Sequence, residues 1–396
     1  MRRGQLSSAY GLRVLAQPRF RMAAAAAVLA IILVFRAAQL LAYSTQAPWG
    51  HDFSAYWMAG RHVLAGEPLY AGFQLAGPPT QGIQYEYLYP PFFAVVIAPF
   101  ASLFEDYRTA NWAWAAIGAV IIALVVMGVA RREGLAEGRR QLLLVGAAFG
   151  FAPVVGELII GGVQLLILGL LAGAWLALRN RTPRGELAAG ALVGIAALIK
   201  VFPGLLILWL LLTGRIRAAA AAVATMAVLS AVTVPVVGLQ AWLDYPTVLL
   251  HLGTLVDVRD LLAPTVWLSE LMPPTLARVV VTMAGLGVVA WVARRGPQAV
   301  SFAVAVAISI LITPSLFQHY LALLVLPLLL AMRYAPPLGW VAVAYLLMSG
   351  GEQEALGDMV WIVNRVLPTL GALLVVAGLI WFGRERPKPS GASLSP

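Results

Sequence analysis

Long apolar runs separated by short polar stretches recur along almost the whole chain, and they constrain its fold more than any other feature. A helix that crosses a membrane needs about 20 mostly apolar residues. Charged residues make up 11% of this chain, against roughly 25% in soluble domains. The sequence therefore predicts an all-α, polytopic bundle of about 12 transmembrane helices. The runs lie at 22–43, 110–130, 141–156, 163–178, 187–200, 202–213, 217–238, 276–293, 298–313, 316–332, 338–349 and 361–382.

No stretch of the chain is typical of a soluble domain, so we expect one transmembrane domain over residues 1–386. Several arginines precede the first run, as they would in a signal peptide, but the run at 22–43 is too long for one and many others follow it. We expect it to be an uncleaved first helix. The tail at 387–396 is rich in Pro, Ser and Gly and is predicted to be disordered and cytoplasmic.

Arginine clusters between the runs predict the orientation, because short loops rich in Lys and Arg stay in the cytoplasm. If 91–104 does not cross and 187–213 forms a hairpin of two short helices, every cluster and both termini are cytoplasmic. The alternative lets 91–104 cross and makes 187–213 one broken helix, which leaves seven arginines outside. We favour the first count, with 44–109 as the first outer loop. The clusters are Arg131, Arg132, Arg139 and Arg140; Arg179, Arg181 and Arg184; Arg215 and Arg217; Arg294 and Arg295; Arg333; and Arg384, Arg386 and Lys388.

Composition and motifs also exclude several classes of function. The net charge of +10 comes from these loop clusters, so we expect no nucleic-acid partner. The chain has no cysteine, which excludes disulfides, Cys-ligated zinc and thiol nucleophiles. It has no Walker loop, no dinucleotide fingerprint and no His/Asp cluster with metal-ligand spacing. We therefore expect no cofactor and a site that works without a metal.

The first outer loop begins with an acidic residue followed by aromatic ones. Asp52 stands where the first helix leaves the membrane, and Tyr56, Trp57 and Tyr70 follow it. The pattern suits a general base held at the lipid–water boundary, with the aromatic side chains as interfacial anchors and as flat faces on which a sugar can stack. The alternative is that Asp52 only caps a helix that begins at Phe53.

Lys200 stands in the middle of a stretch that is otherwise apolar and uncharged. A charge at that depth is costly unless it meets an anion or a water-filled cavity. A phosphate is the anion that we expect, with Pro203 opening the backbone nearby. The alternative is that the lysine extends to an interface.

Three polar residues at predicted outer turns complete the candidate set. His319 follows Gln318 at the outer start of the run at 316–332, so it faces the same compartment as Asp52. A lone histidine has either a catalytic or a purely hydrogen-bonding role. Gln164 and Glu157 flank a Gly-Gly turn, where they can contact sugar hydroxyls or simply make the turn polar.

These motifs together resemble a known family. They are Asp52-Phe-x-x-Tyr56-Trp57, Gly66-x-Pro68-Leu69-Tyr70, Tyr89-Pro90-Pro91, Lys200-x-Phe202-Pro203 and Gln318-His319-Tyr320. The set resembles the bacterial mannosyltransferases of glycosyltransferase family 87, which have a GT-C membrane fold and use polyprenyl-phosphate-mannose. The resemblance implies that Asp52 is the general base of an inverting transfer and that His319 lines the site. The Gly-Gln-x-Asn turn common in that family is absent, since Gly161-Gly162-Val163-Gln164-Leu165 stands in its place.

We therefore expect a multi-pass enzyme of the plasma (inner) membrane with its active site on the non-cytoplasmic face. Its partners would be a polyprenyl-phosphate sugar donor, with mannose as the expected sugar, a lipid-linked or glycan acceptor, and membrane lipids. The expected substrate-binding residues are Tyr56, Trp57, Tyr89, Lys200, Gln318 and Gln164. The alternative is a transporter or flippase of a polyprenyl-linked sugar, which an intramembrane lysine and a broken hairpin would also suit. The chain lacks the visible repeated halves that are common in transporters.

Overall fold

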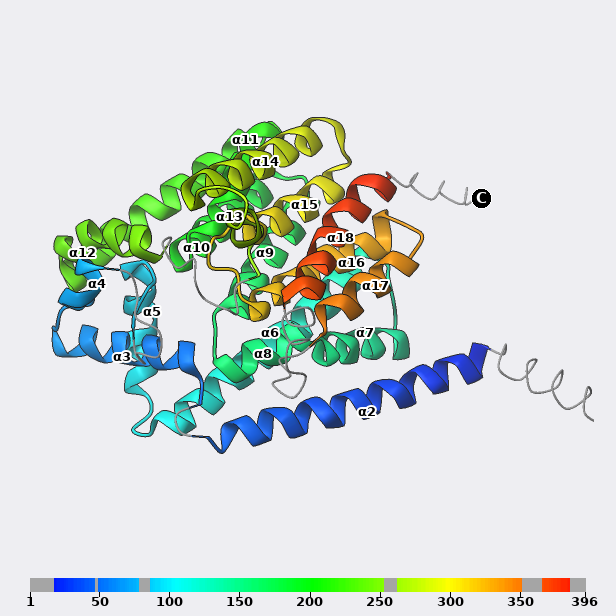
Figure 1. Cartoon of the computed structure of the whole chain (residues 1–396), viewed down its shortest axis with the longest axis horizontal. Coiled ribbons are helices and arrows are strands. Elements are labelled where there is room, and N and C mark those ends of the chain that lie inside the picture. The colour runs from blue at the N-terminus through cyan, green and yellow to red at the C-terminus, as the bar shows by residue number, and fades with distance from the viewer. Residues whose placement is uncertain (1–17, 47–48, 78–85, 253–261, 351–364, 385–396) are drawn as a thin grey trace, which may run out of the picture.

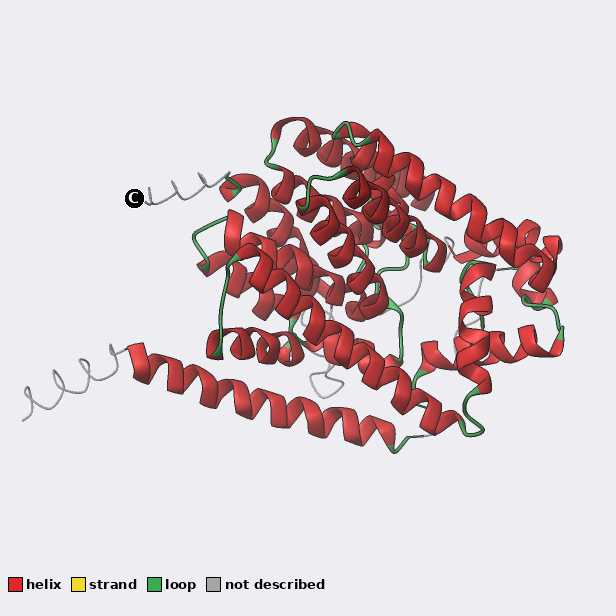
Figure 2. Cartoon of the chain, turned by 180° about the vertical axis from the view of Figure 1, so that it is seen from behind, coloured by secondary structure: helices red, strands yellow, loops and turns green. Residues whose placement is uncertain are grey.

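The computed structural model describes residues 18–46, 49–77, 86–252, 262–350 and 365–384, and throughout this part of the chain the regular elements are helices (Figure 2). Four of these helices are long and apolar enough to cross a membrane, and a bent pair could form a fifth crossing. Seven shorter apolar helices accompany them among the described residues. The predicted all-α, polytopic bundle is confirmed. The tail predicted at 387–396 lies outside the described residues.

The helices follow one another with short connections. Their bounds are α2 Pro18–Ser44, α3 His51–Ala65, α4 Gly72–Ala76, α5 Pro91–Ser102, α6 Tyr107–Glu133, α7 Arg139–Gly150, α8 Ala152–Ile160, α9 Gln164–Arg179, α10 Pro183–Ile199, η1 Phe202–Gly204, α11 Leu205–Leu212, α12 Ile216–Leu252, α13 Pro264–Ser269, α14 Pro274–Arg295, α15 Gln298–Leu311, η2 Gln318–Leu324, α16 Val325–Tyr334, α17 Gly339–Met348 and α18 Leu367–Phe382.

Two predicted runs are broken where the sequence predicted a single helix. The run at 141–156 is divided between α7 and α8, which meet at an angle of 59°. Phe151 between them has an extended backbone, and Pro153 stands in the first turn of α8. Proline has no N–H to continue the helical hydrogen bonds, which explains the break. The run at 316–332 likewise begins as the 3-10 helix η2 before it becomes α16.

The centre of the bundle is α15, in which every residue from Ala299 to Leu311 is buried. Trp175 of α9 stacks on Phe302 at 5.2 Å between ring centroids, and Trp209 of α11 donates a hydrogen bond of 3.1 Å to Ser301. The indole N–H is thereby satisfied inside an apolar core. These contacts hold α9 and α11 against the central helix.

The close packing of α10 on α12 depends on two glycines four residues apart. A Cβ at Gly190 or at Gly194 would clash with the backbone carbonyl oxygen of Ala218 or of Ala222, respectively. Small residues at this spacing allow two membrane helices to approach until their backbones touch. The pair fixes α10, and Lys200 directly follows its last residue.

The arginine-rich helix ends gather at one end of the bundle. Buried Glu133 at the end of α6 binds Arg179 at the end of α9 (3.2 Å) and accepts a hydrogen bond from Tyr334 at the end of α16 (2.6 Å). The backbone N–H of Arg384 in turn donates to the Tyr334 carbonyl. Four of the predicted basic clusters therefore lie close together. This arrangement favours the count that places all of them on one side of a membrane.

At the opposite end, α3, α4 and α5 form a separate layer against the second arm of α12 (Figure 1). The arms of α12 meet at a kink at Gly238, whose φ of 81° and ψ of 155° are not helical. α5, which covers most of the predicted segment 91–104, packs on α3 and α12. The described ends of α2 and α18 that are nearest the chain termini lie at the far end from this layer (Figure 1).

Candidate active site

The first turn of α3 presents Asp52. The N-cap is Gly50, which has a left-handed backbone with φ of 78°. The helix begins at His51, so Asp52 is its second residue. The alternative that Asp52 caps a helix beginning at Phe53 is therefore wrong. A side chain at position 50 would clash with Asn111 of α6, which donates a hydrogen bond to the Trp49 carbonyl. This close approach fixes the start of α3 and leaves the Asp52 carboxylate free of a structural capping role.

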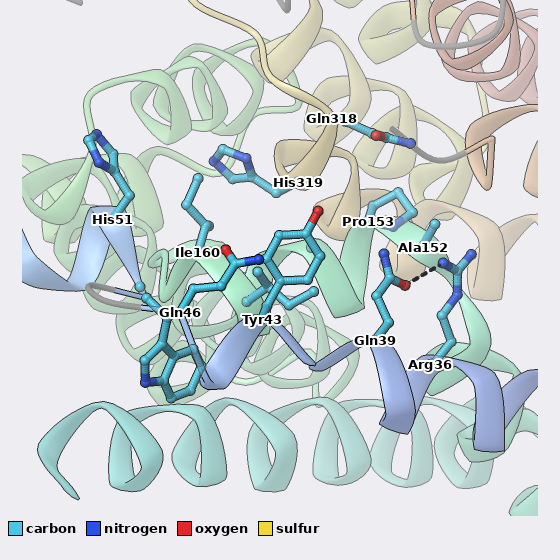
Figure 3. A pocket seen from close by; sticks show the side chains of 14 residues that line it. Arg36, Gln39, Tyr43, Gln46, His51, Ala152, Pro153, Ile160, Gln318 and His319 are labelled. Carbon is cyan, nitrogen blue, oxygen red and sulfur yellow. Dashed lines mark hydrogen bonds between the residues drawn. The ribbon is translucent and has the colours of Figure 1, made fainter. Parts of the chain in front are cut away.

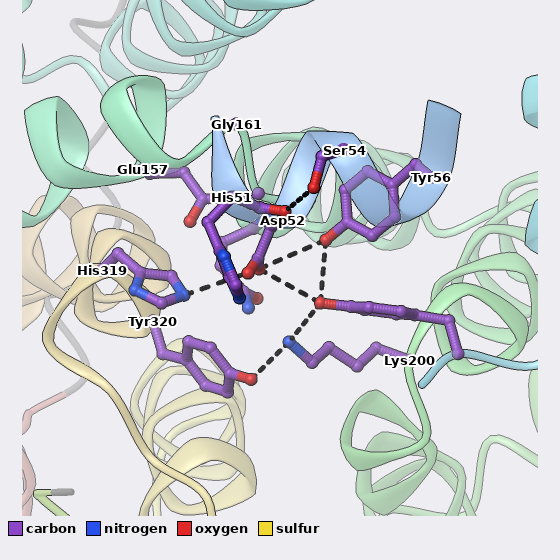
Figure 4. Close-up of polar contacts among 12 residues, drawn as sticks. His51, Asp52, Ser54, Tyr56, Glu157, Gly161, Lys200, His319 and Tyr320 are labelled. Atoms are coloured by element: carbon purple, nitrogen blue, oxygen red, sulfur yellow. Dashed lines mark hydrogen bonds and ion pairs between the residues drawn. The ribbon is translucent and has the colours of Figure 1, made fainter. Parts of the chain in front are cut away.

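Two tyrosine hydroxyls orient the Asp52 carboxylate (Figure 4). Tyr56, one turn later in α3, and Tyr89, just before α5, lie 3.3 and 3.2 Å from Asp52 Oδ2. Their own hydroxyls are 2.8 Å apart. Burial raises the pKa of both tyrosines well above the ordinary value, and the nearby Asp52 carboxylate adds to the rise at Tyr89. At neutral pH both hydroxyls therefore keep the protons that they donate.

Lys200 follows the end of α10 and extends into the same cluster. Its ammonium donates to the Tyr320 hydroxyl at 2.6 Å and lies 3.4 Å from the Tyr89 hydroxyl. It also lies 3.8 Å from the Tyr320 ring centroid, within reach of a cation–π interaction. Among the described residues, no carboxylate lies within 4.0 Å of it. The side chain thus brings its ammonium into the site, where the Tyr89 hydroxyl lies between it and Asp52, instead of extending away from the site.

His319 lies in η2 on another side of Asp52, and its Nε2 is 3.9 Å from Asp52 Oδ2. The Nε2 atom is buried and has no hydrogen-bond partner among the described residues. The ring packs edge-on against Tyr320 at 4.8 Å, which fixes its direction. The Asp52 side chain keeps 18% of its surface exposed, so it is still reachable from outside. The structure therefore brings the predicted trio of Asp52, Lys200 and His319 together.

A second carboxylate lies beside this trio. Glu157 of α8 is fully buried, and Figure 4 shows it near Asp52 and His319. Its Oε1 accepts a hydrogen bond from the Gln164 backbone N–H, and Gly162 leaves the space that this contact needs. Its Oε2 has no partner among the described residues. One Glu157 oxygen is thus committed to the backbone, which ties the turn between α8 and α9 to the site.

Three of the predicted substrate-binding residues lie outside the contacts around Asp52. The Gln164 side chain is fully buried, and its amide atoms have no described partner. Trp57 packs against Phe53 and Tyr107, with 6.2 Å between its ring centroid and that of Tyr107. The Gln318 amide donates to the backbone carbonyls of Met348, the last residue of α17, and of Gly350. None of these three side chains hydrogen-bonds to Asp52 in the described structure.

The aromatic residues expected as interfacial anchors are instead buried in the layer behind the site. The exposed fractions of Tyr56, Trp57 and Tyr70 are 0%, 7% and 5%, whereas a side chain that contacts headgroups must be exposed. The prediction that they are interfacial anchors is therefore wrong. Tyr70 donates a hydrogen bond of 2.7 Å to the Tyr89 carbonyl. It therefore helps to position one of the two tyrosines that hold Asp52.

A cavity of about 260 Å³ adjoins the site on the His319 side (Figure 3). It lies between α2, the start of α3, α8 and η2. Its lining residues are Arg36, Gln39, Tyr43, Gln46, Trp49, Gly50, His51, Ala152, Pro153, Gly156, Ile159, Ile160, Gln318 and His319. His51 precedes Asp52 in α3, and His319 lies 3.9 Å from the Asp52 carboxylate. A molecule in this cavity would therefore lie close to Asp52. Gln318 is thus part of the cavity wall, although it does not contact Asp52.

Comparison with known proteins assigns the chain to a family. The model of glycosyltransferase family 87 matches residues 87–314, which is more than half of the chain. The chain belongs to glycosyltransferase family 87. The match includes Tyr89, Glu157 and Lys200 of the site. Asp52 and His319 lie outside the matched residues. Their place in the candidate site therefore depends on their contacts in the structure and not on the family match.

Two curated relatives of this family 87 protein carry the same name, polyprenol-phosphate-mannose-dependent alpha-(1-2)-phosphatidylinositol mannoside mannosyltransferase. The one from Mycobacterium tuberculosis is 27% identical over 218 residues, which cover 52% of this chain and 49% of the relative. The one from Mycolicibacterium smegmatis is 28% identical over 204 residues, with 46% and 43% covered. The chain thus spans about half the length of the curated relatives it matches. No solved structure matches it.

Sequence reasoning did not predict the place that two residues have in the candidate site of this family 87 protein. Tyr320 provides the closest contact of Lys200, and it stands in the quoted motif directly after His319. Glu157 was predicted either to contact sugar hydroxyls or to make its turn polar, and its burial beside Asp52 was not predicted. An acidic residue four positions before the Gly-Gly pair of an apolar segment was the available signal, because a buried charge in a membrane protein is functional by default. Across the described residues, no group of three His, Asp or Glu side chains has a geometry suited to a metal ion.

Proposed function

We propose that this protein transfers a sugar, with mannose as the first candidate, from a polyprenyl-phosphate donor to a glycolipid or glycan acceptor with inversion. The observation that carries the proposal is the meeting of Asp52 with Lys200 through Tyr89 in a chain of family 87. A base and a cation joined by one hydroxyl suit a reaction in which one oxygen loses a proton while another gains negative charge. The names of the two relatives support a mannose donor and a phosphatidylinositol mannoside acceptor.

The proposed step is a single displacement. Asp52 accepts the proton of the acceptor hydroxyl as that oxygen bonds to the anomeric carbon of the donor, and the bond from this carbon to the phosphate oxygen breaks. The Tyr56 and Tyr89 hydroxyls hold the carboxylate in one orientation. Lys200, with Tyr320 beside it, would stabilise the departing phosphate. Because polyprenyl phosphate already leaves as an anion, the step needs no general acid.

His319 is proposed to line the acceptor side of this reaction. Its buried Nε2 faces both Asp52 and the cavity, with no partner among the described residues. A sugar hydroxyl placed there could hydrogen-bond the ring while it approaches the base. The site lies at the end of the bundle opposite the arginine-rich helix ends, which supports a non-cytoplasmic active site in the plasma (inner) membrane.

The experiment supplies membranes that contain the overproduced full chain with a panel of radiolabelled polyprenyl-phosphate sugars, namely mannose, glucose and arabinose. We expect the mannose label to enter a glycolipid or glycan fraction at a rate several-fold above that of the other sugars. Membranes without the chain are the background control. Labelling from a nucleotide sugar, with none from any polyprenyl-phosphate sugar, would contradict the proposed donor class.

A further inference from the structure

The cavity beside His319 contains a cation that the proposed chemistry does not use. Arg36 lies in α2, at the end of the cavity away from His51 and His319 (Figure 3). It is eight residues before the end of its helix, or about 12 Å along the helix axis. Its guanidinium donates to Gln39 at 2.9 Å, and its Nε is buried without a partner among the described residues.

The residues around Arg36 form a polar stripe on an otherwise apolar helix. Arg36, Gln39 and Tyr43 recur at intervals of three and four, which places them on one face of α2, and Gln46 continues the pattern just beyond its end. Large apolar side chains on other faces of this part of α2 are exposed, as expected for a surface in contact with lipid; they are Ile31, Val34, Phe35 and Leu41. This polar face lines the cavity. Polar side chains that face a cavity inside a membrane protein cost free energy unless a polar molecule binds to them.

Among the described residues, the charge of Arg36 also has no carboxylate to neutralise it. No described carboxylate lies within 4.0 Å of its guanidinium. A cation that lines a cavity inside a membrane protein is stabilised by an anion that enters the cavity. A guanidinium binds phosphate or carboxylate oxygens through two parallel hydrogen bonds, and a lipid substrate most commonly offers phosphate.

The Arg36 cavity and Lys200 lie on different sides of Asp52. His319, which lines the cavity, approaches Asp52 from one side, while Tyr89 and Lys200 approach it from another (Figure 4). A transfer between two lipid substrates needs the base between donor and acceptor. We propose that the Arg36 cavity is a second anion site, which binds the phosphate of a lipid substrate and places the attached headgroup beside His319 and Asp52.

The size of the cavity fits this occupant. About 260 Å³ is at the small end of ligand pockets, so it holds a phosphate with part of a headgroup, while the lipid chains would lie along the exposed apolar faces of α2. The phosphate could belong to a phospholipid acceptor or to the polyprenyl donor. The inference rests on the proposed function for the role of the lipid, but the binding itself is measured without transfer.

The test is native mass spectrometry of the purified full chain in detergent, titrated separately with phosphatidylinositol, polyprenyl phosphate and uncharged diacylglycerol. The variants are Arg36→Met, Arg36→Lys and Lys200→Met. Arg108→Met is the matched control, because Arg108 is exposed on α6 outside the cavity. Arg36→Gln replaces Arg36→Met if the latter does not yield folded protein.

We expect Arg36→Met to weaken binding of at least one phosphate lipid about tenfold or more, because hydrogen bonds to charged groups contribute at this level. Arg36→Lys should weaken binding less than Arg36→Met does, since it keeps the cation but loses the two parallel hydrogen bonds. Loss of phosphatidylinositol would assign the cavity to an acceptor-type lipid. Loss of polyprenyl phosphate in Arg36→Met but not in Lys200→Met would assign it to the donor.

Two results would overturn the proposal. One is that Arg36→Met binds both phosphate lipids as well as the unchanged protein does. The other is that diacylglycerol binding falls in parallel with that of the phosphate lipids, which would show that the substitution only disturbs packing. Because no sugar transfer enters the measurement, these results are independent of whether the panel of polyprenyl-phosphate sugars labels a product.

Discussion

Replacing Asp52 with asparagine should lower kcat by about 10³-fold, because general bases contribute about 10² to 10⁴ to a rate. Asparagine keeps the size of the side chain and an oxygen that Tyr56 and Tyr89 can donate to, so the geometry of the first turn of α3 should persist. A base acts on the transition state more than on binding. We therefore expect the KM for the donor to remain within about threefold of the original value.

The measurement is steady-state transfer by the purified full chain in nanodiscs, with folded yield checked by size-exclusion chromatography. Asp244→Asn is the matched control, since Asp244 accepts a hydrogen bond from Gln240 on α12 and makes no contact in the site. It should leave kcat unchanged. Turnover near the original level in Asp52→Asn would show that the carboxylate has no catalytic role.

Replacing Lys200 with methionine should lower kcat/KM for the charged donor by about 100-fold, which corresponds to loss of a buried charge-assisted contact to phosphate. Methionine keeps the apolar stem, so the change isolates the charge. Lys200→Arg should retain part of the activity because it keeps a cation. Lys200→Glu should be worse than methionine, since a carboxylate would repel the phosphate.

The measurement is the steady-state kinetics of the three Lys200 variants and of Tyr320→Phe. The comparison separates the effect of the Lys200 charge from the effect of its hydrogen bond to the Tyr320 hydroxyl. Tyr320→Phe removes the 2.6 Å contact to the ammonium but leaves the charge, so its effect should be smaller than that of methionine. Original kinetics in Lys200→Met would mean that the phosphate is held elsewhere. Arg36, which lines the adjoining cavity, would then be the first candidate among the described residues.

The fold class could be predicted from the sequence because a chain with so few charges has to bury its apolar surface in lipid. The breaks were harder to predict. Pro153 divides a run of sufficient length into two helices, and hydropathy averaged over such a run does not register a single missing N–H. The 3-10 start of the run after Phe317 was also missed, since residue composition does not distinguish a short 3-10 helix from the first turns of an α-helix.

The site could be predicted in part. Asp52 and Tyr56 are four residues apart and share a helix face, so their contact was within reach of sequence reasoning. Trp57, one position further, points to a different face and packs into the aromatic layer instead. The contact of Lys200 with Tyr320 joins residues 120 positions apart, and only the packing of the helices brings them together.

The most direct test of the proposed displacement is the anomeric configuration of the product, measured by NMR with a donor of known configuration. A single carboxylate that acts as the base, as proposed for Asp52, predicts inversion, since the acceptor oxygen attacks opposite the leaving phosphate. Glu157 is the rival group, because a second carboxylate near the reacting carbon could form a covalent sugar intermediate. One of its oxygens is bound to the Gln164 backbone, so we expect inversion. Retention of configuration would contradict the single displacement and point to a second nucleophile.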